Sequence, residues 1–370
     1  MMANNGKTYG NALFLYGGGL CALAADGIAY SCEIAKSANV FGKVYVGYYS
    51  FLALTNETLI YDWEKCGYDS QKYGGGHFGT CRNVDLTNPI LKRKAIQICK
   101  NLEIRWIFIG GGDGSSRQVA EIAADFWSEG ISLCFFMPFT LDGINGGLSV
   151  GIKPAVTVSL YCINQTAGTF LNTLEGNRVG GAIYELQGRN RDDILLNVLK
   201  RLTEQKLIGD YDASSVEVIA LPANLPWLPT KLEAKISESR ETQYFSLAKG
   251  IKGVPTIILL SEGASISKET IVKIAANNGM KYRSFTVGHL SQMNDMVSDD
   301  ERTDLKLILE SAFKLAFENL EEGPFTIVFE NEKSAPRVEP IDYFAKLNPR
   351  KAQQQVFTLE EAAFLRNYMP

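Results

Sequence analysis

Short apolar segments recur along this 370-residue chain and alternate with longer segments in which the apolar residues have helical spacing. The run from Ile131 to Met137 is nearly continuous, with only Ser132 polar, which is typical of a parallel strand buried on both faces. Similar runs, rich in β-branched and aromatic residues, predict further strands. These are expected at residues 12–16, 43–49, 106–109, 181–186, 216–221, 256–260, 283–287 and 325–329.

Helical patterns lie between these strands. Val119, Ile122 and Phe126 are spaced as on one face of a helix, which we expect to begin at Ser115 or Ser116. Further helices are expected from the first glycine turn to about residue 35, at 89–101 and around 305–316. The alternation of strand and helix predicts an α/β fold with mainly parallel sheets and helices on both faces.

Two regions depart from this alternation. Pro222, Pro226 and Pro229, together with a charged segment, predict a long excursion over residues 222–242. The tail from Asn331 is polar and has little strand pattern. The pattern therefore gives little indication of a strand in the tail.

Composition narrows the function classes. The length allows two domains or one large two-lobed unit, and 46% apolar residues is the content of an ordinary soluble globular protein. A net charge of −4 indicates neither nucleic acid nor another polyanion as partner. The polar start lacks a signal-peptide core, and no apolar run approaches the roughly 20 residues that span a bilayer. We expect a cytoplasmic protein with no membrane or nucleic-acid partner.

Cysteine and histidine usage argues against a disulfide framework or a structural metal. The seven cysteines lie between Cys21 and Cys162, are odd in number and form no CxxC pair. The two histidines, His77 and His289, are too few for a histidine-based metal site. Free cysteines are also typical of the cytosol.

The glycine turn at residues 108–116, FIGGGDGSS, is the most informative stretch. It connects a predicted strand to a predicted helix, so backbone N–H groups and the helix N-terminus can approach phosphate oxygens. Asp113 then stands where a carboxylate can hold a phosphate-bound Mg²⁺ ion. The alternative is an aspartate that only caps the helix, but the surrounding glycines favour the phosphate and Mg²⁺ role.

A second polar site follows the buried strand, at Thr140 and Asp142. Ligands of open α/β sheets bind at the carboxyl ends of the strands, where Asp142 can accept a proton from an attacking hydroxyl group. Thr140 can add a hydroxyl contact. The alternative is an aspartate in a glycine-rich turn, and the local residues leave both interpretations open.

Other candidates are weaker one by one. The turn at residues 17–19 is either a second phosphate loop or a tight turn between strand and helix. Arg189 can meet an anionic substrate or is a solvated arginine. Five polar residues share a position near the carboxyl ends of predicted strands, namely Asp113, Asp142, Arg189, Glu262 and His289.

The order of these motifs resembles the phosphofructokinase family from about residue 10 to residue 330. The GGDG sequence alone also suits NAD kinases and lipid kinases, which do not carry the later series. The matching motifs are Gly17-Gly18-Gly19, Arg82 within Gly79–Arg82, Gly111–Ser115, Thr140-Leu141-Asp142, Gln187-Gly188-Arg189, Ser261-Glu262-Gly263, Arg283 and Gly288-His289.

This resemblance implies two similar Rossmann-like α/β lobes with mainly parallel sheets and an active site between them. Residues 8–152, completed by about 291–345, would form the nucleotide- and phosphate-binding lobe. Residues 153–290, completed by the tail 346–370, would form the lobe that binds a sugar phosphate. The family also implies a homo-oligomer, either a dimer or a tetramer.

The resemblance further implies a role for each site residue. Asp113 would serve Mg²⁺, and Asp142, beside Thr140, would be the base that takes the proton from the sugar 1-hydroxyl group. Arg189 would stabilise the transferring phosphoryl group. The donor would be bound by Gly17, Gly18, Arg82, Gly112, Asp113, Gly114 and Ser115. The sugar phosphate would be bound by Glu262, His289, Arg178 and Arg283, the two arginines at its 6-phosphate.

Departures from the family pattern define the alternatives. Gly19 stands where the family has Asp, the second carboxylate is missing after Asp142, and Gln292 stands at an arginine position. These losses favour a non-catalytic, ligand-binding or regulatory paralogue as the rival of an enzyme. Gly114 matches ATP users rather than pyrophosphate users, so ATP is the expected donor and pyrophosphate the alternative. Phe139 matches neither group, and its ring is expected to narrow the phosphate channel.

Overall fold

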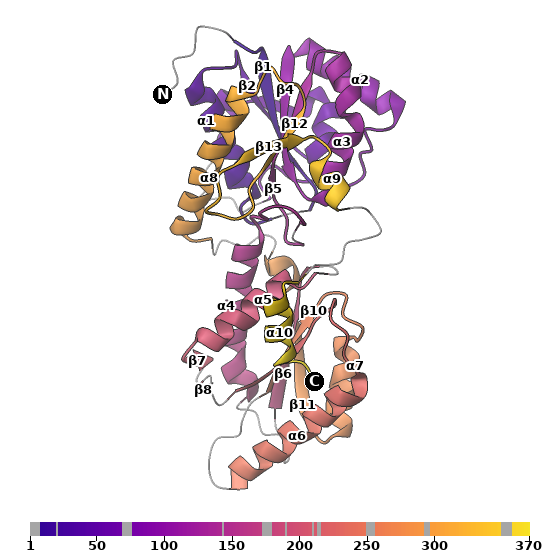
Figure 1. The fold of residues 1–370 in the computed structure, drawn as a ribbon, viewed down its shortest axis with the longest axis vertical. Coiled ribbons are helices and arrows are strands. Elements are labelled where there is room, and N and C mark those ends of the chain that lie inside the picture. The colour runs from indigo at the N-terminus through magenta and orange to yellow at the C-terminus, as the bar shows by residue number, and fades with distance from the viewer. Residues whose placement is uncertain are drawn as a thin grey trace. The chain divides into compact units, whose positions relative to one another are not determined.

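The chain divides into two compact units in a computed structural model (Figure 1). One unit comprises residues 1–151 and 292–352, and the other comprises residues 152–291 and 353–370. The functions expected for the two lobes stay predictions. The structure describes residues 8–19, 21–68, 76–142, 144–171, 180–188, 191–208, 211–212, 216–248, 256–291, 297–348 and 357–370.

A seven-stranded sheet organises the first unit, in the order β13-β12-β5-β4-β1-β2-β3. The five inner strands are parallel, and the two edge strands, β3 and β13, are antiparallel to their neighbours. All inner strands therefore end at the same edge. The strands are β1 (Asn11–Gly17), β2 (Val44–Gly47), β3 (Ile60–Asp62), β4 (Ile104–Gly111), β5 (Ser132–Pro138), β12 (Phe325–Val328) and β13 (Arg337–Pro340).

Helices cover both faces of this sheet (Figure 1). Successive strand residues point to opposite faces, so Phe14 and Phe108 join the core beneath α1 and α8, while Leu13 and Ile107 join the core beneath α2, α3 and α9. The α/β arrangement with helices on both faces is thus confirmed for this unit. The helices are α1 (Ala24–Ala38), α2 (Pro89–Asn101), α3 (Asp113–Ser128), α8 (Asp299–Glu318) and α9 (Tyr343–Leu347), with 3₁₀ turns η1 (Ser50–Thr55), η2 (Glu57–Leu59) and η3 (Trp63–Lys65).

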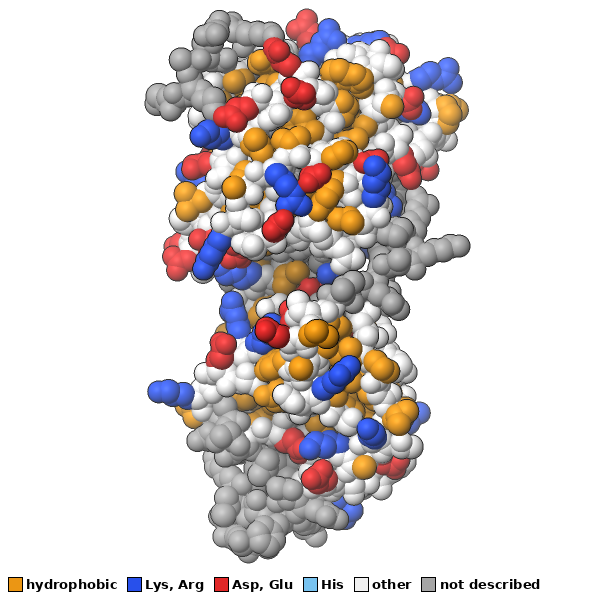
Figure 2. Space-filling view, in the orientation of Figure 1, with side chains coloured by type: hydrophobic (Ala, Val, Ile, Leu, Met, Phe, Trp, Pro, Cys, Tyr) orange, Lys and Arg blue, Asp and Glu red, His pale blue; other side chains and the backbone are white. Residues whose placement is uncertain are grey.

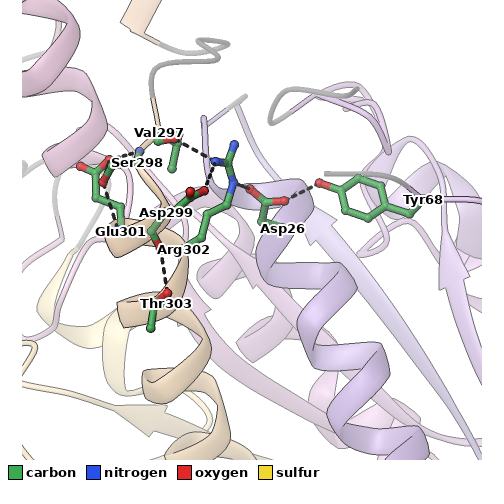
Figure 3. A network of polar contacts seen from close by, with 8 residues as sticks. All are labelled: Asp26, Tyr68, Val297, Ser298, Asp299, Glu301, Arg302 and Thr303. Carbon is green, nitrogen blue, oxygen red and sulfur yellow. Dashed lines mark hydrogen bonds and ion pairs between the residues drawn. The ribbon is translucent and has the colours of Figure 1, made fainter. Parts of the chain in front are cut away.

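A polar network fixes the start of α8 against α1, the helix that follows the first glycine turn (Figure 3). Ser298 caps α8 in a reciprocal capping box with Glu301. Arg302, one residue further along α8, reaches the buried carboxylate of Asp26 on α1, with 3.2 Å between Nε and the carboxylate oxygen. The Tyr68 hydroxyl donates to the same carboxylate at 2.7 Å. Burial raises the pKa of Asp26, while Tyr68 and Arg302 oppose that shift.

The second unit contains a four-stranded parallel sheet in the order β11-β6-β10-β9. The chain's C-terminal segment returns to this unit, where the N–H of Ala220 donates to the carbonyl of Tyr368. Its strands are β6 (Gly180–Leu186), β9 (Glu217–Leu221), β10 (Thr256–Ser261) and β11 (Lys281–Thr286), plus a short pair, β7 (Leu207–Ile208) and β8 (Tyr211–Asp212). Its helices are α4 (Ile152–Leu171), α5 (Asp193–Glu204), α6 (Pro229–Ala248), α7 (Lys268–Asn277) and α10 (Leu359–Arg366), with the 3₁₀ turn η5 (Gly288–Ser291).

The structure differs from the sequence pattern in two regions. Much of the expected excursion at 222–242 is α6, because Pro229 is the first residue of that helix, where proline is tolerated. The polar tail contributes β13, whose residues are mostly half-buried and therefore carry no apolar run. β13 is an edge strand of its sheet, where packing demands less apolar character.

The surface shows no strong bias of charge on the face drawn in Figure 2, where acidic and basic side chains are interspersed. Within the described part of the chain, no helix is both long enough and apolar enough to cross a membrane. All seven cysteines are free thiols.

Candidate functional site

The two glycine turns of the first unit lie against each other at the carboxyl edge of the sheet. Gly17 at the end of β1 pairs in register with Gly111 at the end of β4. A Cβ atom on Gly111 would lie 2.1 Å from the carbonyl oxygen of Gly17, a distance that no side chain can occupy. Gly18 has a φ of +103°, in the region that favours glycine. The sequence therefore needs glycine here to bring the two backbones into contact.

Helix α3 begins directly at this contact. Gly112 is its N-cap, and the N–H groups of Ser115 and Ser116 both return to the Gly112 carbonyl at 3.1 Å. The Ser115 side chain is buried, and its Oγ lies 2.6 Å from where a Cβ on Gly17 would stand. The structure thus brings together four expected donor-site residues: Gly17, Gly18, Gly112 and Ser115. A helix N-terminus beside a glycine turn is suited to an anion.

Asp113 starts α3, and both of its carboxylate oxygens are engaged. Oδ1 accepts the N–H of Gly114 at 2.7 Å, and Oδ2 pairs with Nη1 of Arg117, one helical turn later, also at 2.7 Å. The same Nη1 donates to the carbonyl oxygen of Asn348 at 2.8 Å. The carboxylate is therefore neutralised by a cation belonging to the chain.

The fit of this site to Mg²⁺ follows from that pairing. Mg²⁺ is held by one or two carboxylates together with phosphate and water oxygens. Asp113 shares one carboxylate oxygen with Arg117, and the other accepts the N–H of Gly114. Because the chain itself neutralises this carboxylate, the arrangement does not fit a Mg²⁺ ion at Asp113. The role of Asp113 as a Mg²⁺ ligand stays a prediction, and we derive no chemical step through the metal.

Arg82 lies over the first glycine turn. Its Nη2 atom is 2.5 Å from where a Cβ on Gly19 would stand, so the guanidinium fills the space of a side chain at that position. The Thr80 hydroxyl donates to the carbonyl of Gly18, which attaches the segment carrying Arg82 to the turn. The glycine at position 19, a departure from the family pattern, is thus what admits the arginine.

The loop after β5 places the expected catalytic residues beside this turn. The N–H of Phe139 donates to the Gly111 carbonyl at 3.1 Å, and Thr140 Oγ1 lies 3.6 Å from where a Cβ on Gly112 would stand. Thr140 Oγ1 also accepts the N–H of Asp142 at 3.2 Å, and the Asp142 side chain is exposed. Thr140 and Asp142 therefore lie at the same edge as the glycine turns.

Tyr16 and Cys21 lie beneath this group and are held in their protonated forms. Burial raises the pKa of the Tyr16 phenol well above its usual value, and nearby Arg82 and Asp142 exert smaller, opposed effects on it. The phenol donates to the Gly19 carbonyl and supports the turn from below. Burial also raises the pKa of the Cys21 thiol to about 12, which excludes a reactive thiolate there.

The expectation that Phe139 narrows the phosphate channel is wrong. Its side chain is fully buried. The ring fills the space where Cβ atoms on Gly27 and Gly110 would stand, at 2.2 and 2.5 Å. It also packs edge-on against Tyr16, with 6.1 Å between the ring centroids. Phe139 is therefore part of the core beneath the loops and does not face a ligand.

The second unit has its own polar edge. The N–H of Glu262, after β10, donates to the carbonyl of Leu186 at the end of β6 at 2.9 Å. His289 lies in η5, immediately after β11, so its backbone belongs to the same edge. Gly188, the centre of the expected arginine motif, has a φ of +121°. Two further expected residues, Arg178 and Arg189, lie outside the described residues.

Arg283 lies inside a strand and not at the start of one, as the strand predicted at 283–287 would have it. It is the third residue of β11 and pairs with Ala182 of β6, while Thr286 pairs with Glu185 near the carboxyl end. At about 3.3 Å per residue, Arg283 lies roughly 10 Å before the end of its strand. Its side chain is exposed on an edge strand of this sheet. The structure therefore does not group Arg283 with Glu262.

The sequence analysis missed a buried carboxylate in the second unit. Asp192 accepts the N–H groups of Ala223 and Asn224 at 2.7 and 3.0 Å, and it also accepts the Ser261 hydroxyl. It thereby joins the segment after β6 to the loop after β9 and to the last residue of β10. The signal was the pair Asp192-Asp193 directly after the arginine motif and before a helical pattern.

Arg117 and Asn348 were also missed in the first unit. Arg117 lies four residues after Asp113, the helical spacing of an ion pair, and this spacing could have revealed it. Asn348 is buried and contacts the backbone of Asn145 through two hydrogen bonds, at 2.9 and 3.1 Å. It connects the loop that carries Asp142 to Arg117. Nothing in the polar tail indicated that contact.

Comparisons with known proteins agree with this fold. No family model matches the chain. Over 126 residues it is 27% identical to the ATP-dependent 6-phosphofructokinase of Glaesserella parasuis serovar 5, and this match covers 34% of the chain and 36% of that relative.

Solved phosphofructokinases superimpose over nearly the whole chain. The Pichia pastoris phosphofructokinase in the T-state does so with a TM-score of 0.73 at 16% identity, covering 99% of this chain and 42% of that one. The pyrophosphate-dependent phosphofructokinase from Marinobacter aquaeolei gives 0.67 at 18% identity, covering 97% and 91%. The sequence match thus spans about a third of the curated relative, and this chain spans less than half of the Pichia chain. The chain has the phosphofructokinase fold, and the resemblance to that family which its motifs indicate is confirmed.

Proposed function

We propose that the chain transfers the γ-phosphoryl group of ATP to the 1-hydroxyl group of fructose 6-phosphate or a related sugar phosphate. The observation that carries this proposal is the contact of the Gly17 and Gly111 turns beside the loop of Thr140 and Asp142. Phosphoryl transfer requires a phosphate-binding loop and a carboxylate close together, because its catalysis consists mainly of positioning and charge stabilisation. Both lie at this edge of the sheet.

In this mechanism the backbone N–H groups at Gly18 and at the start of α3 bind donor phosphate oxygens. Asp142 accepts the proton of the attacking hydroxyl group, and Thr140 fixes the Asp142 backbone. Arg82 binds the donor phosphates, and Arg189 supplies positive charge to the transferring phosphoryl group. Glu262, His289 and Arg178 bind the sugar phosphate, and Arg283 binds the phosphate of the sugar held by a neighbouring copy.

The preference for ATP over pyrophosphate rests on Gly114. Among the described residues, the atom nearest to a Cβ built there is Nη2 of Arg117, 4.0 Å away, so that part of the chain does not crowd the position. Because Phe139 is buried, it does not argue against ATP. The curated relative is named for ATP, whereas a structural neighbour is named for pyrophosphate.

An assay of the purified protein with fructose 6-phosphate and each donor tests this function. We expect formation of the 1,6-bisphosphate with ATP, at a low rate because of the lost second carboxylate. Turnover with pyrophosphate but not with ATP would reverse the donor assignment.

The second candidate is a non-catalytic paralogue that binds the same ligands. It is favoured by the pairing of Asp113 with Arg117 and by the glycine at position 19. This candidate predicts that ATP and fructose 6-phosphate bind to well-folded protein without turnover. Product formation that falls in Asp142→Asn would exclude it.

The Arg283→Ala variant is expected to raise the KM for fructose 6-phosphate with little change in kcat. Loss of a charged hydrogen bond to the substrate phosphate costs roughly 1.5–3 kcal/mol, or about 10- to 100-fold in KM. Steady-state kinetics measures this, with Arg93→Gln, an exposed arginine on α2, as the control. An unchanged KM would exclude Arg283 as a phosphate ligand.

Assembly and location complete the proposal. We infer a homo-oligomer, a dimer or a tetramer, because Arg283 is exposed on an edge strand from which it would reach a neighbouring copy. The partners are a nucleotide and a sugar phosphate, and the location is the cytoplasm. Light scattering of the purified protein measures the oligomer directly.

A further inference from the structure

We propose that Arg117 takes the place of a Mg²⁺ ion at Asp113, so that this site binds the phosphates of metal-free ATP. The inference rests on the proposed function, since it concerns the same donor site. It follows from the pairing of the one carboxylate at the start of α3 with a cation from the chain itself.

The ion pair is built into the helix. Asp113 and Arg117 are four residues apart on α3, a spacing that places their side chains on one face. Their side chains are 30% and 17% exposed, so the pair is partly removed from water and less screened than a surface pair. The backbone N–H of Gly114 holds the other carboxylate oxygen at 2.7 Å.

Asn348 holds the guanidinium in place from the other side. Nη1 of Arg117 donates both to Asp113 and to the Asn348 carbonyl, at 2.7 and 2.8 Å. Asn348 is itself buried and hydrogen-bonded to Asn145. A cation anchored at two points is positioned in advance, as a metal would be by its ligands.

Arg117 keeps donors for a ligand. A guanidinium has five N–H donors in a planar fork that matches phosphate oxygens. In the described part of the chain, only those on Nη1 are engaged, and the groups on Nη2 and Nε have no partner. Nη2 lies 4.0 Å from where a Cβ on Gly114 would stand, beside the helix N-terminus that the glycine turns face.

A Mg²⁺ ion would compete for the same carboxylate. It binds oxygen at about 2.0–2.1 Å with near-octahedral geometry, and it would have to share Asp113 with a guanidinium or displace it from two anchors. Like charges at such a separation repel. The phosphates are therefore bound by Arg117, Arg82 and backbone N–H groups, and the Mg²⁺ complex of ATP gains nothing over free ATP.

Titration calorimetry of ATP with the full chain tests this, once in EDTA and once in excess Mg²⁺. We expect wild-type protein to bind ATP at least as tightly in EDTA. In Arg117→Gln, binding in EDTA should weaken about tenfold or more through loss of charged hydrogen bonds, and added Mg²⁺ should restore it because the guanidinium no longer competes for the Asp113 carboxylate. Arg93→Gln, on α2, is the matched control and should match wild type in both buffers.

Asp113→Asn separates the two interpretations and keeps the local shape and the contact with the Gly114 N–H group. If Arg117 is the cation, the variant binds ATP in EDTA as tightly as wild type or more tightly, because Arg117 is released. If Asp113 holds Mg²⁺, the variant loses Mg²⁺-dependent affinity. Wild-type binding of ATP only with Mg²⁺, lost in Asp113→Asn, would overturn the inference and leave the proposed function standing. No ATP binding by folded protein in either buffer would overturn both.

Discussion

Replacing Asp142 with asparagine is expected to lower the turnover of fructose 6-phosphate by about 10²–10⁴-fold, the usual cost of losing a general base. Asparagine has nearly the same shape but cannot accept the proton of the attacking hydroxyl group. The Asp142 side chain is exposed, and the link to Thr140 uses its backbone N–H group, so the loop should keep its conformation. The measurement is kcat with ATP as the donor.

Two further measurements isolate the proton transfer. ATP binding by Asp142→Asn should equal that of wild type, since the glycine turns are unchanged. Asp125→Asn is the control for charge, because Asp125 is an exposed carboxylate about 18 Å along α3 from Asp113, the first residue of that helix, and pairs with Lys92 at the surface. Near-full turnover in Asp142→Asn would exclude Asp142 as the base.

The sequence predicted this edge because glycine spacing is a backbone requirement. The close contact of Gly17 with Gly111 admits no Cβ atom, so both turns need glycine at the contact. These glycines can be recognised in the sequence. The position of Asp142 followed from the rule that parallel strands end at one edge. These features depend on local chain geometry and on the positions of the strands along the chain. Both can be predicted from the glycine spacing and the hydrophobic pattern.

Side-chain partners were less predictable because they depend on packing between distant segments. Asp113 was predicted to hold a phosphate-bound Mg²⁺ ion, but Arg117 pairs with it, and Asn348, which is 231 positions later in the chain than Arg117, holds that arginine. Asp192 was missed for the same reason, since its partners Ala223 and Ser261 lie after β9 and at the end of β10. Arg283 was predicted to begin a strand at 283–287, but β11 already begins at Lys281.

The interpretation of Phe139 depended on the direction of its side chain, which the sequence does not give. The residue follows a strand that points at the site, and its sequence neighbours Pro138 and Thr140 give no indication of the direction of the ring. Gly27 and Gly110 provide that indication only in three dimensions, because the ring occupies the space their side chains would take. Glycines on α1 and β4 thus accommodate a bulky residue after β5.

The Phe139→Ala variant is therefore expected to destabilise the protein and not to open a phosphate channel. Truncating a fully buried phenylalanine costs about 3–5 kcal/mol, because apolar contacts are lost and a cavity remains. For a unit of this size the loss corresponds to a melting temperature lower by roughly 6–20 °C. Differential scanning calorimetry measures the shift, and Trp127→Ala, which truncates a half-exposed aromatic residue on α3, serves as the control with a small effect.

Kinetics of Phe139→Ala below its melting temperature completes the test. The cavity lies beneath the Gly110 end of β4 and the start of α1, so the glycine turns lose their support and ATP binding should weaken. Phe139→Leu, which keeps most of the volume, should recover much of both properties. If the ring blocked the donor, its removal would raise the turnover and leave the melting temperature unchanged. That result in Phe139→Ala would show that Phe139 lies in the phosphate channel.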